Sequence, residues 1–211
     1  MKTNFLKLSL LALVIFTASC DKDDDNNNTT PVAVVTTKVS NIPAPQTGGG
    51  QSGTPIGGEF TKFSFSENKI VTTEKWDIAF RGTTIIVNGG AKVGITDEPS
   101  RTGVAAVSIV SGTFSSITAF PAATTFVQDA ANSVYAIPTG SDKGWYNYNQ
   151  STSLITPLAG KVFVVKTHDG KYAKFEILSY YKDAPATPTA TSAARYFTFN
   201  YAYQANSTTT F

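Results

Sequence analysis

The sequence contains very few of the side chains that carry out catalysis or bind metals. Its 211 residues include one cysteine, Cys20, one histidine, His168, and one methionine, Met1. A single cysteine excludes a disulfide within the chain and any metal site built from a cysteine cluster. A Ser-His-Asp triad would need His168 together with a serine and a carboxylate from distant parts of the chain. We therefore expect a protein that is not an enzyme.

Long hydrophobic runs are also missing, with one exception near the N-terminus. Residues 6–16 are mostly apolar, follow Lys2 and are followed by the small residues Thr17-Ala18-Ser19 directly before Cys20. The run is too short to span a bilayer as a helix of the mature protein, and it has the layout of a secretory signal. Small residues before a cysteine resemble the lipobox of bacterial lipoproteins. We predict a signal peptide at 1–19 and acylation of Cys20, for example with palmitate, as a membrane anchor.

Charged residues are scarce, and neither sign dominates. They make up 15% of the chain, with 17 lysines and arginines against 15 aspartates and glutamates. Because Lys2 and Lys7 lie in the predicted signal peptide, the mature chain has equal numbers of basic and acidic residues. No basic patch is available to attract nucleic acid by counterion release, so we expect no nucleic-acid partner.

The segment 20–57 has the composition of a flexible tether. Residues 21–28 are charged or asparagine and bury nothing, and residues 42–58 are rich in proline and glycine. Lys22-Asp23-Asp24 resembles the export signal of surface lipoproteins of the Bacteroidetes. That resemblance implies an outer-membrane anchor with the folded part facing outward from the cell. Within the segment, residues 32–39 are interpreted as a first edge strand.

Aromatic residues are abundant, with 14 Phe, 9 Tyr and 2 Trp. This composition, with many short alternating segments between turns, predicts an antiparallel all-β domain at 58–211. Its clearest element is a hairpin at 161–181, which turns at Asp169-Gly170 and has His168 at its tip. Further strands are predicted at 104–110, 114–120 and 196–204.

Two groups of residues have both a structural and a functional interpretation. Trp145, Tyr146 and Tyr148 either fill the core or form a platform for a flat ligand such as a sugar ring or a porphyrin. Asp77 lies between apolar residues of a predicted strand, and we expect it to make a structural hydrogen bond or an ion pair with Arg81.

Three motifs together resemble the HmuY family of surface haem-binding lipoproteins. They are Trp-Asp-Ile-Ala-Phe-Arg-Gly at 76–82, Gly-Trp-Tyr-x-Tyr at 144–148 and Lys-Thr-x-Asp-Gly-Lys-Tyr-Ala-Lys at 166–174. The resemblance implies an all-β fold, capture of haem and its delivery to a TonB-dependent outer-membrane receptor.

The family also implies two axial iron ligands, His or Met, from two loops. One position falls near Thr152-Ser153 and the other in the segment 114–134, and neither holds His or Met in this chain. The usual pair is therefore absent. A single histidine or a tyrosinate can serve instead, which makes His168 or Tyr146 the candidate iron ligand. The alternative is a module on the same fold that binds a glycan or another small ligand without haem.

Overall fold

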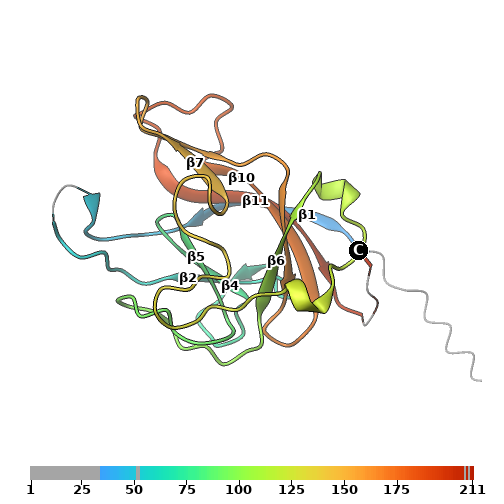
Figure 1. The fold of residues 1–211 in the computed structure, drawn as a ribbon. Coiled ribbons are helices and arrows are strands. Elements are labelled where there is room, and N and C mark those ends of the chain that lie inside the picture. Colours follow the sequence, from blue (N-terminus) through green and yellow to red (C-terminus); the bar gives the residue numbers. More distant parts are fainter. Residues whose placement is uncertain (1–33, 51–52, 207, 209) are drawn as a thin grey trace, which may run out of the picture. The chain divides into compact units, whose positions relative to one another are not determined.

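The folded part of the chain is built from two antiparallel sheets and a separate two-stranded hairpin (Figure 1). The computed structural model describes residues 34–50, 53–206, 208 and 210–211. The predicted signal peptide 1–19 and Cys20 lie outside the described residues. Within the described part, no helix is long and apolar enough to cross a membrane.

The larger sheet has five strands in the order β1-β11-β10-β9-β6, and the smaller sheet has four in the order β3-β2-β4-β5. The strands of the larger sheet are β1 Thr36–Pro43, β6 Ala106–Ser111, β9 Lys161–Lys166, β10 Tyr172–Tyr181 and β11 Ala194–Gln204. Those of the smaller sheet are β2 Thr61–Ser64, β3 Lys69–Ile70, β4 Ile78–Arg81 and β5 Thr84–Val87. The separate hairpin consists of β7 Tyr146–Asn149 and β8 Leu154–Pro157.

The predicted central hairpin is confirmed as β9 and β10. Lys166 is paired with Tyr172, and Phe163 with Phe175, in antiparallel register. Gly170 closes the turn with a φ of 83°, a backbone angle that glycine adopts without steric cost. Since β10 also pairs with β11 along its length, this hairpin lies in the middle of the larger sheet.

Aromatic side chains from both sheets form one core. The rings of Phe63 in β2 and Phe199 in β11 pack edge to face with centroids 5.3 Å apart. Phe163 and Phe175 stack at 4.9 Å within the larger sheet. Aromatic pairs of this kind add about 0.5–1.5 kcal/mol each beyond their burial. The aromatic composition therefore serves mainly to hold the two sheets together.

The two sides of this sandwich differ. At the β5–β6 side, the Asn88 side chain donates to the carbonyls of Glu74 and Trp76 and accepts the N–H groups of Thr102 and Gly103. These four bonds satisfy the whole amide and hold three chain segments together. At the opposite side, β1 and β3 are both edge strands.

Two expectations about individual strands need correction. The edge strand expected at 32–39 is β1, which runs from Thr36 to Pro43 and pairs with β11. The part of the segment 20–57 from Thr36 to Pro43 therefore belongs to the sheet and not to a tether. No strand forms at 114–120, where Thr113 caps the short 3-10 helix η2 (Phe114–Ser116) by accepting the N–H of Ser116. The strands predicted at 104–110 and 196–204 are confirmed as β6 and β11.

Candidate functional site

His168 lies in the turn between β9 and β10 and is fixed there by a buried carboxylate. Its ring Nδ1 is 2.8 Å from Oδ1 of Asp77, and its backbone N–H donates to the same oxygen at 2.8 Å. The other oxygen, Oδ2, accepts the N–H of Phe65 at 2.7 Å. The Asp77 side chain is fully buried, whereas the His168 side chain is 17% exposed. The Nδ1 edge of the ring is thus bonded to the buried carboxylate, while another part of the side chain reaches the surface.

The expected structural role of Asp77 is confirmed, but its partner is His168 and not Arg81. The Arg81 guanidinium instead donates to the carbonyls of Gly58 and Thr96. It also packs over the ring of Phe60, 4.4 Å from its centroid. Asp77 immediately precedes β4, while Arg81 is at its far end, so the two side chains serve different parts of the sheet.

The geometry leaves Nε2 as the ring nitrogen of His168 that is available to a ligand. Histidines that bind metals commonly have their other nitrogen hydrogen-bonded to a carboxylate, which fixes the tautomer and the ring orientation. The hydrogen bond to Asp77 raises the pKa of His168, although partial burial acts in the opposite direction. A proton therefore competes with any metal for this imidazole.

A groove of about 380 Å³ lies beside the His168 turn. We call it the Tyr172 groove, and its walls are formed by Val104, Ala106, Ala123, Phe126, Gln128, Lys166 and Tyr172. The N–H of Val104 donates to the carbonyl of His168 at 3.0 Å, which joins the groove to the turn. The rings of Phe126 and Tyr172 meet edge to face at 5.8 Å. Aromatic and aliphatic walls with one ammonium group suit a flat, largely apolar ligand that carries an anionic substituent.

No group of three or more His, Cys, Asp or Glu side chains within the described residues is arranged to hold a metal ion. Haem iron needs no such group, because the porphyrin supplies four nitrogens and the protein adds only axial ligands.

Comparison with known protein families shows the family of the chain. The model of the HmuY protein family matches residues 58–201, which is well over half of the sequence. The chain belongs to the HmuY family. This is a family of binding proteins and not of enzymes. A comparison with curated proteins found no match.

Several solved structures resemble this HmuY protein at low identity. A candidate HmuY-like haem-binding protein from Bacteroides vulgatus ATCC 8482 is 18% identical, with a TM-score of 0.46, over 82% of this chain and 93% of its own. A candidate lipoprotein from Bacteroides fragilis NCTC 9343 is 16% identical, with a TM-score of 0.47, over 81% and 91%. The apo HmuY analogue of Tannerella forsythia is 15% identical, with a TM-score of 0.44, over 84% and 100%.

The structure does not bring the four candidate ligand-binding residues together. Trp145 of this HmuY protein is 1% exposed, donates from Nε1 to the carbonyl of Thr83 at 2.9 Å and packs against Phe197. Tyr146 is buried beside it, and only Tyr148, which is 43% exposed, reaches the surface. The packing of Trp145 thus supports its interpretation as a core residue.

Distance along β10 separates this aromatic group from His168. The ring of Trp145 lies against Tyr180, near the end of β10, whereas His168 precedes the start of that strand at Tyr172. Eight residues of strand span roughly 26 Å. Figure 1 shows β7, which follows Trp145, over the far part of β10. One ligand of porphyrin size does not contact both groups.

The loops to which the HmuY resemblance assigns axial ligands also lie apart. Thr152 and Ser153 form the exposed tip of the β7–β8 hairpin, and Ile155 in β8 donates its N–H to the Tyr181 hydroxyl. The segment 114–134 instead contributes Ala123, Phe126 and Gln128 to the Tyr172 groove. Sequence reasoning missed Lys166 and Tyr172 as groove residues. Their one signal was the hairpin motif at 166–174, which includes both.

Proposed function

We propose that this HmuY protein binds haem, or a related porphyrin, in the Tyr172 groove, with His168 as an axial iron ligand. The supporting observation is the Asp77–His168 hydrogen bond, which fixes the ring in a turn whose backbone carbonyl accepts the N–H of Val104 in the groove wall. Haem here is cargo and not a resident cofactor. We further propose that residues 1–19 direct secretion and that acylated Cys20 anchors the protein at the outer membrane. From the cell surface the protein would pass haem to a TonB-dependent receptor.

Each part of the proposed site has a chemical role. The rings of Tyr172 and Phe126 provide apolar surface for the porphyrin, and the Lys166 ammonium is placed to pair with a propionate. His168 supplies one nitrogen to the iron, as a single histidine does in the globins. The volume of about 380 Å³ lies within the usual range of small-molecule sites, about 300–1,000 Å³.

Binding through His168 should strengthen as the pH rises. Only the neutral imidazole coordinates iron, and Asp77 raises the pKa of His168 above its ordinary value. Raising the pH through this pKa removes the competing proton, so the haemin dissociation constant should fall and then level off.

Titration of the purified protein with haemin, followed by its visible absorption, tests the proposal. We expect a saturable Soret shift near one equivalent. The shift should be lost in His168→Gln, whose amide can still bond to Asp77, and weakened in Tyr172→Leu. Tyr146→Phe is the matched control because Tyr146 is buried with Trp145. A shift that survives in His168→Gln and disappears in Tyr146→Phe would assign the iron to the tyrosine instead.

The alternative of a glycan-binding module is supported by Tyr148. This ring is exposed on β7, and exposed aromatic rings suit stacking against sugar rings. A glycan panel distinguishes the two functions. Binding that is abolished by Tyr148→Ala, in a protein that gives no Soret shift, would replace haem by a sugar ligand.

A further inference from the structure

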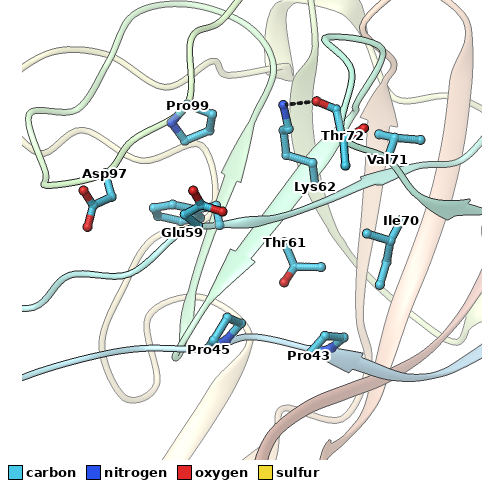
Figure 2. A pocket seen from close by; sticks show the side chains of 11 residues that line it. Pro43, Pro45, Glu59, Thr61, Lys62, Ile70, Val71, Thr72, Asp97 and Pro99 are labelled. Atoms are coloured by element: carbon cyan, nitrogen blue, oxygen red, sulfur yellow. Dashed lines mark hydrogen bonds between the residues drawn. The ribbon is translucent and has the colours of Figure 1, made fainter.

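A second groove, of about 530 Å³, lies at the side of the sandwich where β1 and β3 are the edge strands (Figure 2). We call it the Glu59 groove. Pro43 and Pro45 form one wall, and Ile70 and Val71 form another. Figure 2 shows Thr61 between these walls and Glu59 farther along, on the side of Asp97 and Pro99. None of these residues belongs to the Tyr172 groove, so the two grooves are distinct.

Phe60, the residue directly before β2, has unpaired backbone groups beside this groove. β3 is only two residues long and pairs with Phe63 and Ser64 alone. One further bond, from the N–H of Val71 to the carbonyl of Lys62, shows which side of Lys62 faces β3. Strand backbones alternate, so the N–H and C=O of Phe60 point to that same side, beyond the end of β3. Among the described residues, neither backbone group of Phe60 has a hydrogen-bond partner.

The groove also carries a carboxylate without an ion pair. Within the described residues, the exposed Glu59 side chain forms no salt bridge or hydrogen bond. The Lys62 ammonium is already engaged by the carbonyl of Thr72 at 3.0 Å and by Glu74 at 3.5 Å. Asp97 accepts the N–H of Gly58 with Oδ2, but within the described residues its charge likewise has no ion pair. The unpaired charge in the groove is therefore negative.

Apolar contacts complete the surface. Ile70 is 45% exposed, and the groove also includes Pro43, Pro45 and Pro99. Prolines lack a backbone N–H, so this wall offers side-chain contact and no competing strand donors. In β-strand addition, main-chain bonds to an unpaired strand backbone give affinity and contacts to alternate side chains give specificity. Here the Phe60 backbone can supply the main-chain bonds, and the apolar wall and the carboxylates can contact the side chains.

From these observations we propose that the Glu59 groove binds an extended peptide segment of a partner protein. The segment pairs with the backbone of Phe60, just before β2 and beyond the end of β3, and places a lysine or arginine against Glu59. An apolar residue two positions away contacts Ile70, because alternate side chains share a face. This role is independent of haem and of His168.

A labelled hexapeptide of alternating lysine and valine is the probe, and fluorescence anisotropy with the full mature chain measures its binding. We expect saturable binding that weakens about threefold in Glu59→Gln, as for an exposed ion pair. Glu67→Gln is the matched control, because Glu67 is exposed in the β2–β3 turn but pairs with Lys69. N-methylation of alternate peptide nitrogens, which removes main-chain donors and keeps the charges, should weaken binding about tenfold or more.

Three results with the peptide probes would overturn the proposal. They are the absence of saturable binding, equal binding of a peptide with glutamate in place of lysine, and equal binding of the N-methylated peptide. Strong competition by butylammonium alone would also overturn it, because the groove would then be a site for small amines. His168→Gln should leave peptide binding unchanged, so failure of the haem proposal and failure of this one are separate outcomes.

Discussion

At the scale of single residues, the Asp77 side chain joins segments of the chain that no contact predicted from the sequence joins. Its carboxylate accepts bonds from Phe65, which follows β2, and from the backbone and ring of His168. Asp77 and His168 are 91 positions apart in the chain. The sequence indicated that Asp77 is structural because it lies among apolar residues of a strand. It did not reveal the partner, because no local pattern encodes a contact over that separation.

Replacing Asp77 should destabilise the protein strongly. Asp77→Ala leaves the N–H groups of Phe65 and His168 without their acceptor in a buried site, and loss of one member of a buried charged pair costs about 3–5 kcal/mol. Urea denaturation measures the change in the free energy of unfolding. Asp142→Ala, which removes an exposed carboxylate bonded to Asn147, should cost well under about 1 kcal/mol. Equal costs for the two variants would contradict the role of Asp77.

The stability of the apo protein should depend on the charge of His168. Its folded pKa is raised above the ordinary value of 6.5 by the bond to Asp77. The stabilising contribution is therefore fully present below about pH 6.5 and is lost as the pH rises through the folded pKa. The free energy of unfolding of the wild type should fall between pH 6 and pH 8 by more than that of His168→Gln. Parallel pH profiles for the two proteins would refute this assignment. Haem binding has the opposite pH trend, so the two effects can be distinguished.

At the scale of elements, local pattern predicted the strands that lie inside the sheets and failed where a loop is held by tertiary contacts. The alternation in β10 and β11 and the Asp169-Gly170 turn were sufficient for the central hairpin and the last strand. The segment 114–120 looked like a strand, yet it is a 3-10 turn held by Lys174. The ammonium of Lys174 donates to the carbonyls of Phe114 and Ile117 and lies 4.5 Å from the centroid of the Phe114 ring.

Removing this ammonium should release the loop. Lys174→Met keeps the apolar stem of the side chain but leaves two carbonyls without their donor, which costs about 1–3 kcal/mol. Hydrogen exchange should show faster exchange at Ser116, whose N–H lies in the affected turn. Lys143→Met, at an exposed position, serves as the control. Unchanged exchange at Ser116 would show that the loop is held by other contacts.

The aromatic motif of β7 should prove structural. Trp145→Phe removes the hydrogen bond to Thr83 and leaves a gap in the core, which should lower the free energy of unfolding by about 1–3 kcal/mol. Haemin binding should stay within about twofold of the wild type, because the Tyr172 groove lies at the other end of β10. A loss of haemin binding without a loss of stability would return Trp145 to the ligand site.

At the scale of the whole molecule, the sequence predicted the fold class and the family better than the ligand site. Three motifs were sufficient for the HmuY family because they are the strand and turn segments that the fold itself requires. A groove is different, because its walls come from segments that meet only in space. Val104, Phe126 and Tyr172 line one groove although no motif connects them. The missing His/Met pair likewise showed which ligands are absent and not where a ligand binds.

The anchor can be tested on the whole chain. Under the proposed acylation of Cys20, we expect the wild-type protein to incorporate labelled palmitate and to partition into detergent, since acyl chains would hold it at a membrane. Cys20→Ala should remove both the label and the partitioning. Extracellular protease should release the folded part from intact cells that carry the wild type. Labelling that persists in Cys20→Ala would exclude the lipoprotein assignment.

The four hydrogen bonds of the Asn88 side chain affect how the protein changes chemically during storage. An asparagine followed by glycine, as in Asn88-Gly89, is prone to deamidation, because the next backbone nitrogen attacks the side-chain carbonyl. Here both ends of the amide are occupied by four hydrogen bonds, and a Cβ on Gly89 would lie 2.0 Å from the Ala105 carbonyl oxygen. The Asn88 side-chain carbonyl and the Gly89 backbone nitrogen therefore cannot move together to react while the fold is intact. The rate at which aspartate appears at position 88 in stored protein would therefore report how often the sandwich opens at this site.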